Sequence, residues 1–259
     1  MRTLIVAAAF AAVSVCAQAA DLKVKEAAAL PVKAPLPPAY DPYTGFYLGA
    51  DIGYGWDRGN LGASFPGGPA DFGDLSNAPQ GVLGGIYTGF GTRVPGFLAG
   101  LGLDAYLGIE GNGDWGNISG TAATPGLPFA NGVVASTNDR WLASARGRFG
   151  LIYQNVMFYG TAGWGWGSTT LNVTTVAPGA AVGVPVGTNK TTENGFAWGG
   201  GIEFPWFFGP NWKARFQYLQ YDFGTNVACI ITTCGLPTQM AVTQKNQVDE
   251  VTVGVSYKF

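Results

Sequence analysis

The sequence contains no histidine, and only 12% of its 259 residues are charged. Histidine is the commonest general acid or base and the commonest metal ligand of proteins, so its absence removes the usual route to both kinds of chemistry. The 14 basic and 16 acidic residues give a formal net charge of −2, whereas nucleic-acid binding needs a basic face. We therefore expect no enzyme activity, no metal or other cofactor, and no nucleic-acid partner.

Cysteine is scarce as well, with three residues in the chain. Cys16 falls within an export signal described below, which leaves Cys229 and Cys234 at the two ends of "CIITTC". Two thiols without histidine are an incomplete zinc set, but a close pair in an oxidising compartment favours a disulfide. We predict that Cys229 and Cys234 form a disulfide that staples the tip of a loop.

Glycine and aromatic residues are abundant instead, with 41 Gly and an aromatic fraction of 14%. Low charge combined with many aromatic residues argues against disorder, because disordered chains lack the apolar groups that offset the entropy of ordering. The length allows one large β domain or two smaller domains. The chain is therefore expected to be folded, and its pattern must decide the fold.

The N-terminal region has the pattern of an export signal followed by a spacer. Residues 4–15 are apolar after a positive start, and Ala17-Gln18-Ala19 offers small residues for cleavage. We predict a signal peptide over residues 1–19 and favour it over an uncleaved membrane helix because of this small-residue exit. Residues 20–44 are rich in Pro and Ala without a period, which favours an extended periplasmic spacer.

From residue 45 onward, apolar or aromatic residues alternate with Gly and polar ones, which is the period of a β-strand. The segments have 12 to 15 residues, enough for a tilted strand to cross a hydrocarbon core. We therefore predict an all-β fold, an eight-stranded antiparallel up-and-down transmembrane β-barrel over residues 45–259. Its strands are expected at 45–56, 80–91, 101–112, 139–153, 155–167, 193–204, 211–224 and 246–259.

Two further patterns favour a membrane barrel over a soluble barrel of the lipocalin type. The connections have 23, 9, 26, 1, 25, 6 and 21 residues, so long external loops would alternate with short periplasmic turns. Aromatic residues fall at both ends of the strands, as two membrane interfaces favour. They are Trp56, Trp141, Trp164 and Trp166 at the long-loop ends, and Phe46, Tyr153, Phe158, Trp206, Trp212 and Phe259 at the short-turn ends.

Four stretches carry a resemblance to a known family: "YTGFYLGADIGYGW" (43–56), "YLGIEGNGDW" (106–115), "FYGTAGWGWG" (158–167) and "VGVSYKF" (253–259). Together they resemble the small outer-membrane β-barrel proteins of alphaproteobacteria, a porin-like surface-antigen family with eight-stranded barrels of the OmpA/OmpX type. The resemblance implies the outer membrane of a Gram-negative bacterium, with lipids and lipopolysaccharide around the barrel. It also implies that the barrel-assembly machinery reads Tyr257 and Phe259 as an insertion signal.

The interior of an eight-stranded barrel is just wide enough for side chains to fill. Because the outer face must be apolar, we expect a polar network in the lumen. Counting positions from the short-turn end predicts that Asp104 lies beside Arg148 and Glu203 beside Lys213. The predicted network comprises Asp51, Asp104, Glu110, Arg146, Arg148, Glu203, Lys213, Arg215 and Glu250.

We interpret the chain as a structural outer-membrane barrel that contributes to envelope integrity and displays antigenic loops. A narrow porin for small solutes or ions is the alternative. A second alternative is surface binding of a ligand or haem by the external loops, where tyrosine would have to replace histidine as the haem ligand. The Pro-rich spacer is a candidate contact with peptidoglycan.

Overall fold

The computed structural model describes residues 41–58, 60–64, 75–76, 79–123, 132–176, 184–206, 208–230 and 241–259. Residues 1–39 and 40–259 form two separate units, and all described residues belong to the second. The predicted signal peptide and the predicted spacer, except its last four residues, lie outside the described residues. No helix among the described residues is long and apolar enough to cross a membrane.

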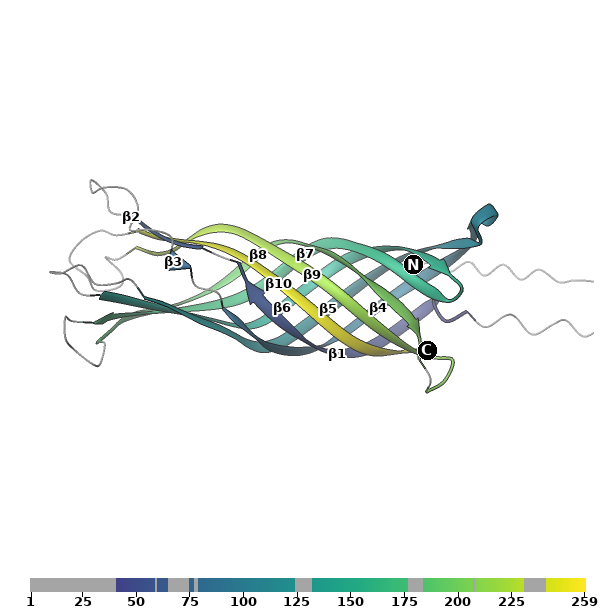
Figure 1. The fold of residues 1–259 in the computed structure, drawn as a ribbon, viewed down its shortest axis with the longest axis horizontal. Coiled ribbons are helices and arrows are strands. Elements are labelled where there is room, and N and C mark those ends of the chain that lie inside the picture. The colour runs from purple at the N-terminus through teal and green to yellow at the C-terminus, as the bar shows by residue number, and fades with distance from the viewer. Residues whose placement is uncertain are drawn as a thin grey trace, which may run out of the picture. The chain divides into compact units, whose positions relative to one another are not determined.

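Eight long strands form one antiparallel sheet that closes on itself (Figure 1). The closing contact joins β10 to β1, from Tyr47 opposite Lys258 to Asp57 opposite Val248. This ring confirms the predicted eight-stranded antiparallel up-and-down β-barrel. The strands are β1 (Gly45–Asp57), β4 (Gln80–Leu98), β5 (Leu103–Ala123), β6 (Gly132–Tyr153), β7 (Val156–Val176), β8 (Val184–Pro205), β9 (Trp212–Ile230) and β10 (Ala241–Lys258), with a 3-10 turn, η1 (Ala99–Leu101), between β4 and β5.

Two short strands extend the ring at the long-loop end of β1. β2 (Asn60–Ser64) continues along β10, with Leu61 opposite Gln244, and β3 (Leu75–Ser76) pairs with β2. Between β1 and β2, the N–H of Arg58 donates to the carbonyl oxygen of Gln247 at 2.8 Å. Backbone pairing therefore continues along β10 beyond the end of β1.

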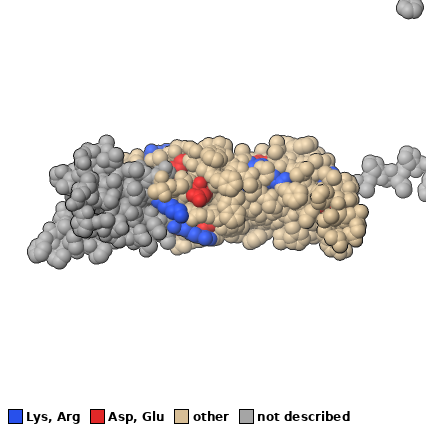
Figure 2. Space-filling model, turned by 90° about the horizontal axis from the view of Figure 1, so that it is seen from above, with Lys and Arg blue, Asp and Glu red and all other residues tan. Residues whose placement is uncertain are grey.

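Side chains alternate between the outside and the inside of the barrel, as the two-residue period of a strand requires. In β1, Phe46 and Ile52 are 50% and 59% exposed, whereas Tyr47 is 1% exposed. In β5, the same contrast separates Ile109 (69%) from Glu110 (4%). In the view of Figure 2, most charged side chains gather toward one end and the remaining described surface is largely uncharged. The apolar face is thus the outer one, as a lipid environment requires.

The strands are longer than the sequence pattern predicted. β5 to β8 have 21 or 22 residues, and β5 stays paired with β6 up to Ala123 opposite Val134. Much of the expected 26-residue connection between residues 112 and 139 is therefore barrel wall. The extension is rich in Thr and Val, as in "TTLNVTTV" (169–176), and such β-branched residues favour strands without any aromatic pattern.

The short-turn end is compact. β6 and β7 are joined at Gln154 and Asn155, whose φ angles are 48° and 70°, and positive φ at both turn residues matches the twist of the flanking strands. The ring of Phe259 lies 5.7 Å from that of Phe46 and 5.3 Å from that of Tyr257, centroid to centroid. The chain therefore ends in an outward aromatic cluster on the closing strand. The role of Tyr257 and Phe259 as an insertion signal stays a prediction.

Candidate functional site in the barrel lumen

A layer of charged side chains fills the middle of the lumen. Its members meet because inward positions face each other across neighbouring strands. Glu110 of β5 lies opposite Arg146 of β6, and Glu203 of β8 lies opposite Arg215 of β9. This charged layer comprises Asp51, Glu110, Arg146, Arg148, Glu203, Lys213 and Arg215, whose side chains are all 0–1% exposed.

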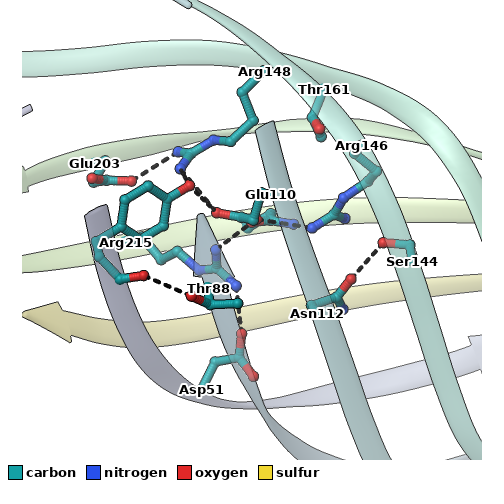
Figure 3. Close-up of polar contacts among 12 residues, drawn as sticks. Asp51, Thr88, Glu110, Asn112, Ser144, Arg146, Arg148, Thr161, Glu203 and Arg215 are labelled. Carbon is teal, nitrogen blue, oxygen red and sulfur yellow. Dashed lines mark hydrogen bonds and ion pairs between the residues drawn. The ribbon is translucent and has the colours of Figure 1, made fainter. Parts of the chain in front are cut away.

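Glu110 lies at the centre of the charged layer (Figure 3). Its carboxylate accepts hydrogen bonds from Arg146 and Arg148, both at 2.9 Å, and from Arg215 at 3.0 Å. The Tyr47 hydroxyl donates to the same carboxylate at 2.8 Å and accepts from Arg148 at 2.7 Å. One carboxylate does not neutralise three buried guanidinium groups, so further acids must lie nearby.

Glu203 and Asp51 provide these acids. Glu203 accepts from Arg148 at 2.8 Å and from the Lys213 ammonium at 2.6 Å, so the structure brings Glu203 and Lys213 together as the sequence predicted. Arg215 contacts Asp51 at 2.5 Å. An unbroken series of ion pairs therefore joins Lys213 to Asp51 through Glu203, Arg148, Glu110 and Arg215.

Aromatic rings enclose the basic groups. The Arg148 guanidinium carbon lies 3.9 Å from the centroid of the Tyr159 ring, and the Lys213 nitrogen lies 4.6 Å from that of Tyr47. A cation over an aromatic face is attracted by the ring quadrupole, most strongly where water is excluded. The tyrosines therefore fill space and stabilise the buried positive charge at the same time.

Tyr43, in the segment that leads into β1, closes the lumen at the short-turn end. Its side chain is 1% exposed, and its hydroxyl lies 2.5 Å from the carbonyl oxygen of Asn155 and 3.1 Å from that of Glu203. The Lys258 ammonium donates to the carbonyl oxygen of Asp41, which ties this segment to the closing strand. Tyr43 belongs to a buried cluster with Tyr106, Ile152, Met157 and Tyr159.

A second cluster closes the lumen on the other side of the charged layer. Ile118, which follows Glu110 along β5 toward the long-loop end, is 2% exposed. It packs with residues that strands all around the ring contribute. This apolar cluster comprises Leu83, Ile118, Leu142, Ala197, Leu219, Tyr221, Phe223 and Val248. The charged layer is therefore enclosed from both ends.

Asp104 does not join the charged layer, and the prediction that it lies beside Arg148 was wrong. The β5–β6 ladder places Asp104 opposite Ile152, four residues nearer the turn than Arg148. Its carboxylate instead accepts from Arg93 and from the N–H of Gly96, both at 2.6 Å, near the end of the β4–β5 hairpin. Counting from the turns failed because β5 begins at Leu103 opposite Tyr153, a register that places Gly108 and not Asp104 beside Arg148.

Glu250 lies in the lumen, 1% exposed, on the long-loop side of the charged layer. The Tyr221 hydroxyl is 3.5 Å from its carboxylate. Nearby, Asn112 donates to Asp114 and accepts from Ser144. The network predicted from the sequence lacks Asn112, Asp114 and Ser144, because it was assembled from charged residues and because the expected strand ended at residue 112. All three occupy inward positions of the alternating pattern, which would have identified them.

The predicted disulfide is not tested by the structure. The backbone of Cys229 pairs with that of Val242 at the end of β9. Cys234 lies outside the described residues. The disulfide therefore stays a prediction.

The model of the family described as "Outer membrane protein beta-barrel domain" matches residues 5–259. The chain belongs to this family. This outer-membrane β-barrel protein is accordingly located in the outer membrane of a Gram-negative bacterium, as the sequence predicted. None of the curated protein sequences matches it.

Solved outer-membrane structures are similar to the barrel in fold. Ail, the attachment invasion locus protein of Yersinia pestis, is 15% identical with a TM-score of 0.36, over 83% of this chain and 100% of Ail. Neisserial surface protein A is 15% identical with a TM-score of 0.36, over 83% and 98%. OprG from Pseudomonas aeruginosa is 12% identical with a TM-score of 0.52, over 84% and 97%. Of these three, OprG has a TM-score above 0.5, and at 12% identity its likeness concerns the fold alone.

Replacing Arg148 with Leu should destabilise the barrel by about 3–5 kcal/mol, because Glu110 and Glu203 would each lose a buried positive partner. Urea unfolding of the refolded barrel in detergent, followed by tryptophan fluorescence, measures the change. Arg93→Leu is the matched control. Its ion pair with Asp104 is 25% exposed on the Arg93 side, so its loss should cost at most about 1 kcal/mol. Unchanged stability of Arg148→Leu would show that Arg148 compensates no buried acid.

Replacing Tyr43 with Ala should cost about 3–5 kcal/mol, because it removes a large aromatic side chain from a buried cluster. Tyr43→Phe keeps the ring and loses only the hydroxyl contacts, so its cost should be about 1 kcal/mol. The same urea titration measures both variants. If Tyr43→Ala unfolds at the wild-type urea concentration, the segment before β1 does not help to hold the barrel closed.

Proposed function

We propose that the protein is a structural barrel that contributes to the integrity of the outer membrane, is closed to solutes, and displays its loops as surface antigens. The observation that carries this proposal is the burial of the charged layer, in which Arg146 and Arg148 have 0% side-chain exposure. Charged groups that line an open pore would be in contact with water. The same proposal assigns the chain no catalytic role.

The way in which the lumen is filled supports a mechanical role. Ion pairs cross the interior of the ring: Arg215 of β9 reaches Glu110 of β5 on the opposite side. Arg148 of β6 also reaches Glu203 of β8, and Arg215 reaches Asp51 of β1, each past one intervening strand. Because these contacts cross the interior, they tie opposite walls together as well as neighbouring strands. A barrel braced in this way resists deformation by the surrounding bilayer.

A narrow porin is the second candidate function. It is favoured by the chemistry of the charged layer, since a polar layer that rearranged would pass water and ions more readily than an apolar one. The proposed structural role requires that such rearrangement does not occur at rest. Electrical conductance therefore decides between the two functions.

The folded protein should give no stable current steps in planar bilayers, because the charged layer leaves no path for water. Arg148→Ala, recorded alongside it, should admit current, since it empties the space between Glu110 and Glu203. Arg93→Ala is the control and should stay silent, because its guanidinium lies outside the charged layer. Folding is verified for each sample by heat-modifiable migration on gels. Stable wild-type steps that change in Arg148→Ala would establish the porin instead.

We further propose the partners that the sequence indicated. Outer-membrane lipids and lipopolysaccharide would surround the apolar outer face, and the barrel-assembly machinery would read Tyr257 and Phe259. Ligand or haem binding by the external loops stays an alternative that rests on the sequence alone. Peptidoglycan is the proposed partner of the Pro-rich spacer, which as an extended chain would reach about 3.1 Å per residue into the periplasm.

A chain that lacks residues 22–40 should sediment less with purified peptidoglycan than the full chain does, since it would lose the segment proposed to bind it. A second variant, with a Gly/Ser segment of equal length in place of residues 22–40, separates reach from sequence. Equal sedimentation of the shortened and full chains would show that the spacer does not bind peptidoglycan.

A further inference from the structure

The enclosed part of the lumen holds one acid more than it holds bases. From the Tyr43 cluster up to Asp114, which precedes Ile118 by four residues along β5, the inward carboxyl groups of the described residues are Asp51, Glu110, Asp114, Glu203 and Glu250, and the inward bases are Arg146, Arg148, Lys213 and Arg215. Asp139 lies beyond this part of the lumen, opposite Ile118. Rotation of side chains can change which groups pair, but it cannot change this count. An uncompensated charge in a space without water is strongly unfavourable.

The excess negative charge is located on the long-loop side of the charged layer. The four bases contact Glu110, Glu203 and Asp51, whereas Asp114 and Glu250 have no ion pair among the described residues. Asp114 is 2% exposed and Glu250 is 1% exposed. One carboxyl oxygen of each of Asp51, Asp114 and Glu250 is buried and has no hydrogen-bond partner within the described part of the chain.

These three carboxyl groups are neighbours. Asp51 of β1 and Asp114 of β5 both lie opposite Gly85 of β4, which has no side chain to separate them. Asn112 donates to Asp114 and lies 3.4 Å from the Tyr221 hydroxyl, which is 3.5 Å from Glu250. Carboxylates that share a site do not all remain ionised, because their repulsion is relieved when one of them binds a proton and donates it to the next. A proton needs no additional space, so it fits a lumen that side chains already fill.

We infer that Asp51, Asp114 and Glu250 form a proton-binding site that holds one shared proton in the closed lumen at neutral pH. The site rests on the closed lumen of the proposed function, and adds a ligand to it. The charged or titratable groups around the site are Glu110 of β5, Arg146 of β6, Arg215 and Tyr221 of β9, and Tyr87 of β4. The neutral polar groups are Asn112 of β5, Ser144 of β6 and Thr252 of β10, while β7 and β8 contribute Gly165 and Ala197.

The bound proton makes stability depend on pH with a definite sign. Above about pH 5 the same carboxyl groups are ionised in the unfolded chain, so the folded state carries one more proton. Raising the pH therefore favours unfolding, by up to a factor of about 10 in the equilibrium constant per pH unit. Asp114→Asn leaves equal numbers of acids and bases and therefore weakens this dependence.

Infrared spectroscopy of the full chain folded in detergent tests the inference directly, because a protonated carboxyl group has a C=O stretching band that a carboxylate lacks. We expect this band in the wild type at pH 7, and its loss in both Asp114→Asn and Glu250→Gln. Asp104→Asn makes the same chemical change in a partly exposed ion pair outside the charged layer, so the band should persist there. Two variants of the site are used so that the test still holds if one of them fails to fold.

Urea unfolding at pH 7 and at higher pH gives the second readout. The midpoint should fall with pH in the wild type and in Asp104→Asn, and fall less in Asp114→Asn. A wild type without the protonated band at pH 7, or a band that both site variants keep, would overturn the inference. If the protonated carboxyl band is absent and the urea midpoint is higher in sodium chloride than in choline chloride, the three carboxyl groups bind a metal cation and not a proton. Conductance steps in planar bilayers would contradict the closed lumen of the proposed function. The infrared band would still decide whether the three carboxyl groups share a proton.

Discussion

The pairing of β10 with β1 is the constraint on which the rest of the structure depends. Inside a bilayer no water is present to satisfy the backbone, so a sheet with open edges is excluded and only a closed ring remains. The ladder from Tyr47–Lys258 to Asp57–Val248 closes that ring. Closure with eight strands fixes how narrow the interior is. It also assigns every residue of the wall to the lipid or to the lumen.

The narrow lumen explains why glycine is so abundant in a folded barrel. Gly89 lies opposite Tyr47 and Gly49 opposite Tyr87 across the β1–β4 ladder, and a Cβ atom on either glycine would collide with the facing tyrosine ring. Each of these two tyrosines thus lies over a position without a side chain. Eight strands cannot accommodate bulky groups at every inward position, so glycine and tyrosine are distributed as complementary partners.

The sequence predicted the ring, its apolar outer face and much of the charged layer, because a two-residue period and the lipid requirement are both local signals. It placed Glu203 beside Lys213 correctly, since both lie close to a short turn from which positions can be counted. It failed for Asp104, because the ladder of β5 with β6 starts at Leu103 opposite Tyr153 and so places Gly108 beside Arg148. The strand extensions were not predicted, because "TTLNVTTV" (169–176) does not alternate between apolar and polar residues. Its Thr and Val residues favour strands by their β propensity, and a strand outside the membrane needs no apolar face. The closing role of Tyr43 could not be predicted, because it depends on contacts with residues more than one hundred positions away.

Buried ion pairs are weak evidence for stability, since apolar residues of similar volume often stabilise a protein as well or better. In this barrel the charged layer has a more specific effect, which is to fix the register of the strands. A slip of one residue between β5 and β6 would turn the inward residues of one strand toward lipid. For β6 that would expose Arg146 and Arg148 to hydrocarbon, where an arginine near the midplane costs about 2–4 kcal/mol. The same slip would leave Glu110 without two of its three guanidinium partners. The charged layer therefore penalises misaligned barrels on both faces of the wall at once, which an apolar filling of the lumen would not do.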